Sequence, residues 1–150
     1  MLNFKAMFKI KNIFIFCFAL LLVLFGVATW QAKQKQDYAR KVVLSKQVRS
    51  VMIYLMLDLR DAKQATLKDV PVDNHWHERM AFVCAVGPVE YGLRAGRVSR
   101  MVAGRTTPIA EHIVFLRLRR LPKDPAVMEV QVQARDGVTL TSNFKIRLRG

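Results

Sequence analysis

The sequence of 150 residues lacks the short motifs on which enzyme and cofactor sites are commonly built. It contains no glycine-rich phosphate loop, no cysteine pair at metal-ligand spacing and no nucleophile elbow. Single serines such as Ser45 and Ser99 fall within helix-like or strand-like patterns, where packing or solvation is their ordinary role. We therefore expect a protein that is not an enzyme, holds no cofactor and has no small-molecule substrate.

Cysteine and histidine, which supply disulfides and most transition-metal ligands, are also scarce, with two and three residues. Cys17 lies in an apolar run and Cys84 in a strand-like segment, so we expect no disulfide between them. Cys84 has the character of a small apolar core residue. His75 and His77 flank Trp76, but no further ligand stands at a convincing spacing, so we predict no metal site.

Acidic residues are few, because 11 Asp and Glu oppose 25 Lys and Arg, for a net charge of +14. The positive charge is spread along the chain without a block of like charge, which is typical of solvated faces. The alternative is a membrane-anchored basic module that binds DNA or an anionic polymer. Its contacts would be the arginines that crowd one predicted hairpin, although an odd spacing points strand side chains to opposite faces: Arg94, Arg97, Arg100 and Arg105.

Charged residues are absent from residues 13–30, which read IFIFCFALLLVLFGVATW. As a helix this run reaches about 27 Å, enough to cross a hydrocarbon core. We predict a transmembrane helix at residues 13–30, preceded by a basic N-terminus at residues 1–12 whose lysines favour the cytoplasmic side. The alternative is a cleaved secretory signal, for which Gly26 and Ala28 offer a small-x-small site.

Proline and glycine are absent from residues 31–65, so the helix should continue beyond the membrane. We expect an amphipathic helix at residues 31–66 whose apolar face packs on a sheet of the same chain. A turn-rich segment at residues 71–74 then ends the helical pattern. The apolar residues of this face recur at spacings of three and four: Leu44, Val48, Val51, Met52, Leu55, Leu59 and Ala62.

Roughly 85 residues remain for a head at residues 67–150, which allows one small domain with one core. Apolar and polar residues alternate there, as in antiparallel strands with one buried face. The predicted fold class is α+β, a long N-terminal transmembrane-plus-amphipathic helix packed on an antiparallel β-sheet. The expected elements are strands at residues 79–86, 113–121, 128–134 and 144–148, a hairpin of residues 89–95 and 97–103 around Gly96, and turns at Gly87-Pro88 and Asp136-Gly137.

Asp58 lies among leucines near the end of the predicted helix. It could be a surface carboxylate beside Arg60 or Lys63, which is the ordinary place for an acidic side chain. The alternative is that Asp58 meets an arginine of the sheet and fixes the helix against the head. We name Asp58 and Arg60 as the candidate contact between helix and head.

The end of the helix, residues 55–62 (LMLDLRDA), resembles the stem of type IV pilin-like minor pseudopilins, particularly the J type of type II secretion. Residues 89–93 (VEYGL) followed by residues 98–100 (VSR) are similar to a hairpin of that family. Residues 109–118 resemble its next strand, and residues 144–149 resemble its closing strand. The resemblance covers nearly the whole chain through short phrases.

The leader departs from the pattern of that family. Its members carry a glycine just before the apolar run, where prepilin peptidase cuts, and an acidic residue five positions into the mature helix. In this sequence Asn12 stands in place of the glycine, and Cys17 stands in place of the acidic residue. A carboxylate within lipid is costly, so a chain without one is suited to staying in the membrane as a single-pass anchor, or to joining a pilus tip by head and stem contacts alone.

The resemblance implies a non-enzymatic structural component of a type II secretion, type IV pilus or DNA-uptake assembly. Its expected location is the bacterial inner membrane, crossed once, with the N-terminus in the cytoplasm and the head periplasmic or extracellular. The implied partners are other pilin-like subunits and inner-membrane assembly proteins, while nucleic acid belongs only to the alternative reading of the basic head.

Overall fold

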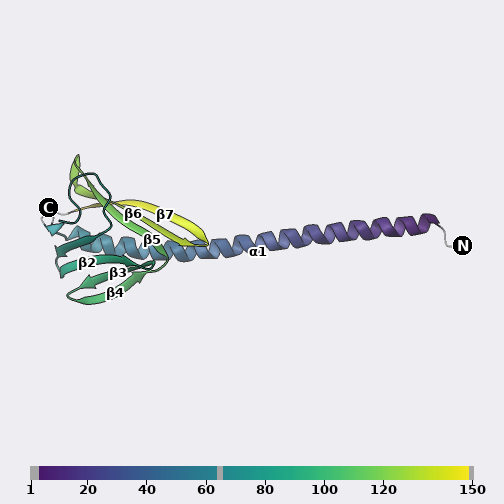
Figure 1. The fold of residues 1–150 in the computed structure, drawn as a ribbon, viewed down its shortest axis with the longest axis horizontal. Helices are drawn as coiled ribbons and strands as arrows, with labels where there is room; N and C mark the ends of the chain where they lie inside the picture. The colour runs from purple at the N-terminus through teal and green to yellow at the C-terminus, as the bar shows by residue number, and fades with distance from the viewer. Residues whose placement is uncertain (1–3, 64–65, 149–150) are drawn as a thin grey trace. The chain divides into compact units, whose positions relative to one another are not determined.

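The computed structural model describes the backbone of residues 4–63 and 66–148, and the side chains of residues 15–63 and 66–148. The chain forms two compact units, residues 1–39 and 40–150. One helix, α1 (Phe4–Arg60), contributes residues to both units (Figure 1). The expected basic N-terminus and the leader residue Asn12 lie outside the described side chains.

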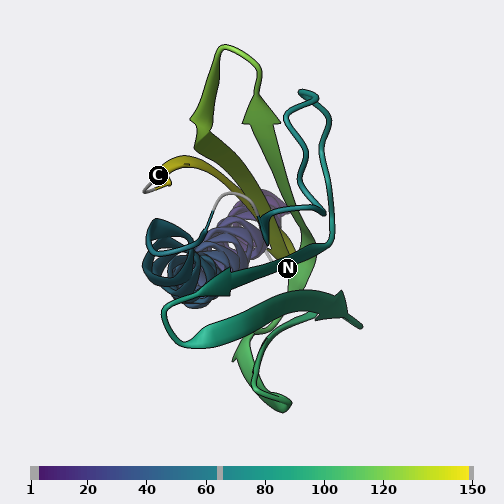
Figure 2. The same cartoon turned by 90° about the vertical axis from the view of Figure 1, so that its left-hand side faces the viewer.

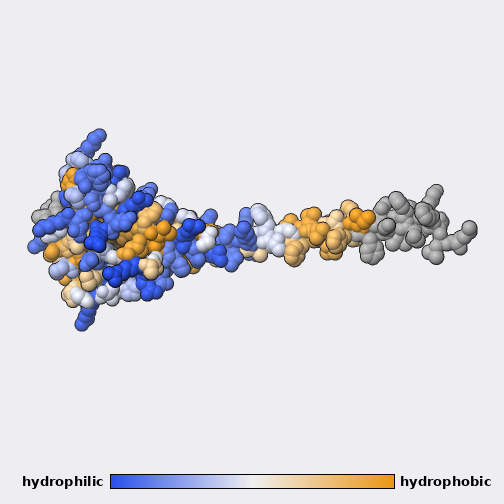
Figure 3. All heavy atoms as spheres, in the orientation of Figure 1, coloured by the Kyte–Doolittle hydropathy of each residue, from blue (hydrophilic) through white to orange (hydrophobic). Residues whose placement is uncertain are grey.

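The described backbone of the first unit, residues 4–39, belongs to α1 and includes the apolar run up to Trp30. Among the described helices, α1 is long and apolar enough to cross a membrane, and none of its most apolar 18-residue window is buried. Phe16 and Phe25 are each 70% exposed. Figure 3 shows this stretch as a continuous apolar surface. Apolar surface of this extent is favourable in lipid, so the unit fits single-pass membrane association.

The predicted apolar face of α1 is confirmed in the second unit. The helix buries one or two side chains per turn on a single side, and Met52 is half-buried. The fully buried members of this face are Leu44, Val51, Leu55 and Leu59, with Val48 at 5% exposed.

The helix ends at Arg60, before the expected end near Thr66. The Ala62 N–H donates to Leu59 O (3.2 Å), three residues back, which tightens the last turn. The next N–H, of Lys63, donates to Val83 O in the sheet (3.0 Å) instead of continuing the helical ladder. A tertiary hydrogen bond therefore ends the helix where local propensity would extend it.

The described residues after the helix form two antiparallel sheets, so the expected sheet is divided in two. Both sheets are meanders, with neighbouring strands consecutive in the sequence. The first sheet contains β1 (Met80–Cys84), β2 (Gly87–Arg94), β3 (Arg97–Val102) and β4 (Arg105–Ala110). The second contains β5 (Ile113–Leu121), β6 (Asp124–Asp136) and β7 (Val138–Arg147).

The two sheets flank the second half of α1, as the view in Figure 2 shows. Alternate residues of β6 are buried, so one face of that strand joins the core and the other meets solvent. Cys84 is 7% exposed, as expected for a core position. The α+β fold class is confirmed. The buried side chains that the sheets contribute to the core include Val89, Tyr91, Val98, Leu116, Leu118, Val130, Val132 and Ile146.

The hairpin predicted around Gly96 is confirmed. Ala95 and Gly96 connect β2 to β3 with φ values of 47° and 75°. Ala103 and Gly104 connect β3 to β4 with nearly the same pair, 48° and 79°. Two successive positive φ values are those of a type I′ turn, whose twist matches that of paired strands, and glycine at the second position lowers its cost.

Three strand predictions were wrong in detail. Gly87 and Pro88 begin β2 instead of forming the turn, which lies two residues earlier, at Ala85 and Val86. Strand β4 was not predicted because it contains Pro108, which is tolerated since β4 pairs only with β3. The strand expected across residues 109–118 is divided, because His112 adopts a φ of 60° between β4 and β5.

Candidate functional site

Asp58 lies in the last turn of α1 and is only 7% exposed. Its Oδ2 accepts a hydrogen bond from Arg100 Nε (2.6 Å), and its Oδ1 accepts one from Arg100 Nη2 (2.8 Å). The hydroxyl of Tyr91 donates to Oδ2 at 2.5 Å. We call Asp58, Tyr91 and Arg100 the helix–hairpin cluster. It joins the helix directly to the β2–β3 hairpin.

Strand register places the two hairpin members of the cluster side by side. Tyr91 of β2 is paired directly with Arg100 of β3, so both side chains leave the same face of the sheet. The ring of Phe82 stacks on that of Tyr91 at a centroid distance of 6.3 Å. The guanidinium of Arg100 also lies 5.9 Å from the ring centre of Tyr54 on the helix. Aromatic packing thus holds both hydrogen-bond donors in place for the carboxylate.

The electrostatics of the cluster favour one protonation state. The two-pronged contact with Asp58 raises the pKa of Arg100, which is therefore a permanent cation. Burial, followed by the hydrogen bond to Asp58, raises the pKa of Tyr91 well above its usual value near 10. Tyr91 stays a protonated donor at neutral pH. Because both carboxylate oxygens of Asp58 are engaged by these donors, the cluster is a structural contact between helix and sheet.

We expect the free energy of unfolding to fall as the pH rises above about 10. Since the pKa of Tyr91 is raised in the folded state, the stabilisation is complete below the unfolded pKa and is lost as the pH climbs toward the folded one. Urea unfolding of the full chain in detergent between about pH 8 and about pH 11 would measure this slope. Tyr91→Phe should flatten it, whereas Tyr38→Phe, at a position 71% exposed, should not. Equal slopes for wild type and Tyr91→Phe would contradict the prediction.

Arg60, the other residue named for the contact between helix and head, is placed outside the cluster. Its side chain is 58% exposed, and its Nε lies 3.8 Å from Asp61 Oδ1. An exposed pair at this distance contributes little to stability. The contact between helix and hairpin therefore rests on Asp58.

The four arginines named for an anionic polymer do not share one surface. Arg100 is committed to Asp58, and Arg97 pairs with Glu111 at 2.7 Å. Arg94 is exposed and lies directly opposite Arg97 in the hairpin. Arg105 follows the turn at the other end of β3. The structure brings together only Arg94 and Arg97 of this set.

The loop with the paired histidines packs on the second sheet. His77 forms a β-bridge with Leu118, and its Nε2 lies 3.1 Å from Asp73 Oδ1. The hydrogen bond from His77 is the main cause that lowers the pKa of Asp73. Trp76 lies under Arg119, whose guanidinium carbon is 4.5 Å from the ring centre. Within the described part of the chain, no group of three metal-ligating side chains is found.

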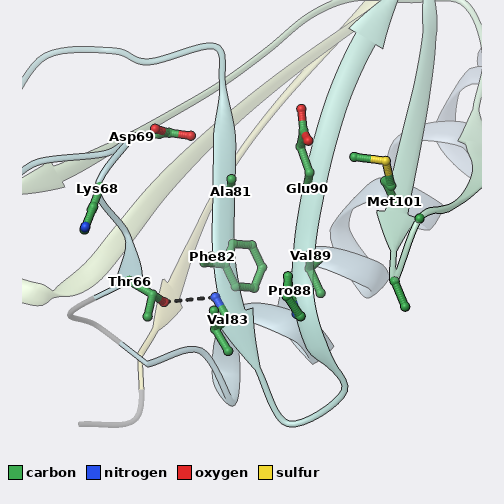
Figure 4. A pocket seen from close by; sticks show the side chains of 12 residues that line it. Thr66, Lys68, Asp69, Ala81, Phe82, Val83, Pro88, Val89, Glu90 and Met101 are labelled. Atoms are coloured by element: carbon green, nitrogen blue, oxygen red, sulfur yellow. Dashed lines mark hydrogen bonds between the residues drawn. The ribbon is translucent and has the colours of Figure 1, made fainter.

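The first sheet also carries a shallow cavity of about 490 Å³ on the side away from α1, beside the loop that follows the helix. Figure 4 shows Lys68 and Asp69 coming from this loop, and Glu90 and Met101 from β2 and β3. The Thr66 hydroxyl accepts a hydrogen bond from Val83 N–H (2.9 Å) and closes one side. The floor is mostly apolar, and Lys68, Asp69 and Glu90 share no hydrogen bond among those drawn in Figure 4.

The sequence contained a signal for the partners of Asp58 that was not used. In β3, Arg100 lies between Val98 and Val102 on alternate positions of the strand. The two valines mark the buried side, so the arginine is on that side as well. A buried guanidinium requires a carboxylate or several acceptors. Asp58, among leucines of the helix, has the complementary requirement. Tyr91, on the same face of the neighbouring strand, completes the set.

These residues are also those that carried the family resemblance. Asp58 belongs to the helix phrase, and Tyr91 and Arg100 belong to the two hairpin phrases, and they meet in space. The class of protein defined by the fold is an α+β chain with one long apolar N-terminal helix packed on antiparallel sheets, an arrangement that resembles the pilin fold. Comparison with family models, curated proteins and solved structures finds no match for this chain.

Proposed function

We propose that this protein is a minor pilin-like or pseudopilin-like subunit of a type II secretion, type IV pilus or DNA-uptake assembly. It acts without catalysis, anchored in the bacterial inner membrane with its N-terminus in the cytoplasm, and binds other pilin-like subunits through its helix. Two features support the proposal: the pilin-like packing of a long apolar helix on antiparallel sheets, and an exposed apolar face on the part of that helix in the second unit.

The exposed apolar face carries the proposal. Among the described residues of the second unit, nine large hydrophobic side chains are exposed, and six of them belong to α1. At 100° per residue, Val42, Ile53, Met56 and Leu57 lie on the side of the helix opposite to the buried Leu44 and Leu55, whereas Val43 and Tyr54 lie on its flank. The head therefore covers one side of the helix and leaves apolar residues on the other. Four of the six residues form what we call the outer helix face: Val42, Ile53, Met56 and Leu57.

The geometry of the outer helix face fits a helical partner. Ile53, Met56 and Leu57 are spaced by three and four residues, which is the ridge that packs between the side chains of a second helix. Lys46 and Arg49 lie on the same side of α1 and favour carboxylates on the partner. We therefore take the partner to be an amphipathic helix from another membrane-anchored subunit, because such a helix offers an apolar stripe flanked by polar side chains.

Site-specific photo-crosslinking in the native membrane tests the proposal. A photoreactive residue in place of Ile53 should form an adduct that mass spectrometry identifies as another single-pass protein with a pilin-like stem. The same residue in place of Thr107, an exposed position of β4, is the control and should give no such adduct. Adducts only with soluble proteins, or the same adducts from both positions, would contradict the proposed function.

A further inference from the structure

Three turns of the second unit meet at one end of the two sheets. The β2–β3 turn joins the start of β5 through a hydrogen bond from Ile113 N–H to Gly96 O (2.9 Å). The end of β6 joins the β4–β5 turn through a hydrogen bond from Arg135 N–H to His112 O (2.8 Å). Residues that are distant in the sequence are thereby brought to a common end of the unit.

The first residues of α1 in this unit lie at the same end. The Gln47 side-chain carbonyl accepts a hydrogen bond from Glu111 N–H (2.9 Å), which ties the helix to the β4–β5 turn. A Cβ added at Gly137 would overlap Arg40 Nη1, so the Arg40 guanidinium covers the β6–β7 turn. Figure 1 shows this turn beside α1. The end with the three turns is therefore the end at which α1 enters the unit.

Basic side chains collect around this end. Lys41, Arg94 and Arg135 are exposed, Arg40 is half-buried and the Arg97 side chain is 60% exposed. We call these five residues the basic patch. The carboxylates of the same turns are fewer, namely Glu111, which pairs with Arg97 at 2.7 Å, and Asp136. The patch therefore keeps an excess of positive charge.

We propose that the basic patch binds the anionic phospholipid headgroups of the membrane that the helix crosses. Arg40, the first residue of the patch, stands only ten positions after Trp30, at the end of the apolar run, and ten residues of helix rise about 15 Å. Arginine and lysine side chains reach several ångströms further, and the surface potential of an anionic leaflet extends over a Debye length of about 10 Å. The patch is thus tethered within reach of the headgroups.

The covalent tether favours lipid over nucleic acid as the occupant. A membrane anchor holds the patch at a high effective concentration near headgroup phosphates, whereas a nucleic acid would have to be recruited from solution. Phosphate contacts by Arg and Lys otherwise use the same chemistry in both cases. An experiment with both ligands can therefore separate them.

The full chain in lipid nanodiscs provides the test. Arginine modification by phenylglyoxal, read residue by residue with mass spectrometry, is compared between discs of phosphatidylcholine and discs that also contain phosphatidylglycerol. We expect the modification of Arg94 and Arg135 to slow about fivefold or more in the anionic discs, and the slowing to vanish in high salt. Arg105, the first residue of β4, follows the turn at the opposite end of β3 and is the internal control, which should react equally in both discs.

A pair of matched variants tests whether the patch acts as a unit. Lys41→Gln with Arg135→Gln should reduce the protection of Arg94, because it removes two charges of the patch. Lys68→Gln with Lys123→Gln removes the same charge from exposed positions on other loops and should leave the protection unchanged. Equal modification in both discs, or equal slowing of Arg105, would overturn the proposal. So would protection of Arg94 by added duplex DNA on neutral discs without any response to phosphatidylglycerol.

Discussion

Replacing Asp58 by Ala is expected to lower the free energy of unfolding of the second unit by about 3 kcal/mol. The substitution removes three hydrogen bonds and leaves the Arg100 guanidinium, whose side chain is 20% exposed, without its carboxylate. The Tyr91 hydroxyl, in a residue 3% exposed, would lose its acceptor as well. A buried donor without a partner costs more than the bond itself contributes to stability.

Urea unfolding of the full chain in detergent measures this effect. Trp76 fluorescence in a Trp30→Phe background reports on the second unit alone, because Trp76 packs under Arg119 in that unit. When Asp58→Ala is heated and followed by the same fluorescence, the midpoint of its thermal unfolding should lie about 10 °C or more below that of wild type. Asp69→Ala, which removes an exposed carboxylate, should change stability by less than about 0.5 kcal/mol. An unchanged midpoint for Asp58→Ala would mean that the helix–hairpin cluster does not hold the helix on the sheet.

A double substitution distinguishes loss of the pair from exposure of an unpaired charge. Asp58→Leu combined with Arg100→Met removes both charges and replaces them with apolar side chains of similar size. The double variant should regain more than half of the stability lost in Asp58→Leu alone, because no buried charge is left without a partner. If the two single effects simply added, the direct interaction between Asp58 and Arg100 would be excluded as the cause.

Two leucines of α1, two positions apart, are expected to respond in opposite ways to the same substitution. Leu55 is fully buried and Leu57 is 60% exposed. Leu55→Ala should cost about 3 kcal/mol of stability, since it removes buried methyl groups and leaves a cavity between the helix and the sheets. Leu57→Ala should change the stability of the isolated chain by less than about 0.5 kcal/mol.

Association with a partner should show the reverse order. If the outer helix face is the docking surface, Leu57→Ala should lower the yield of the crosslinked adduct formed at position 53 several-fold while the chain stays folded. Leu55→Ala, measured at a temperature where that variant is still folded, should keep the yield close to that of wild type. Full adduct yield with Leu57→Ala would remove the apolar face as the basis of the proposed function.

Much of the fold could be predicted from local patterns. The uncharged run up to Trp30 and the spacing of Leu44, Val51 and Leu55 identify the helix, because helical periodicity is a property of neighbouring residues. The same holds for the hairpin at Gly96, where short-range turn chemistry acts. Strand β4 was missed because Pro108 is a poor strand residue except at an edge, and an edge is defined only by the assembled sheet.

The candidate site could be predicted only in part. Asp58 was recognisable as a carboxylate among leucines, but its partners Tyr91 and Arg100 stand 33 and 42 residues further along the chain. Which strand residue faces the helix depends on strand register, and a slip of one position would turn Arg100 outward. Arg60 was named with Asp58 because the two are close in sequence, yet the helix turns its side chain toward solvent.

By itself the sequence determined the apolar helix, the amphipathic face that continues it and the alternation of the strands, since each of these follows from residue types a few positions apart. The tertiary structure decided the division into two sheets, the end of α1 at Arg60 and the meeting of Asp58 with Tyr91 and Arg100. It also decided that three turns, two of hairpins and one between the sheets, gather basic residues around Arg40. These features depend on packing and strand register between segments that are distant in the sequence, so no local pattern of residues predicts them.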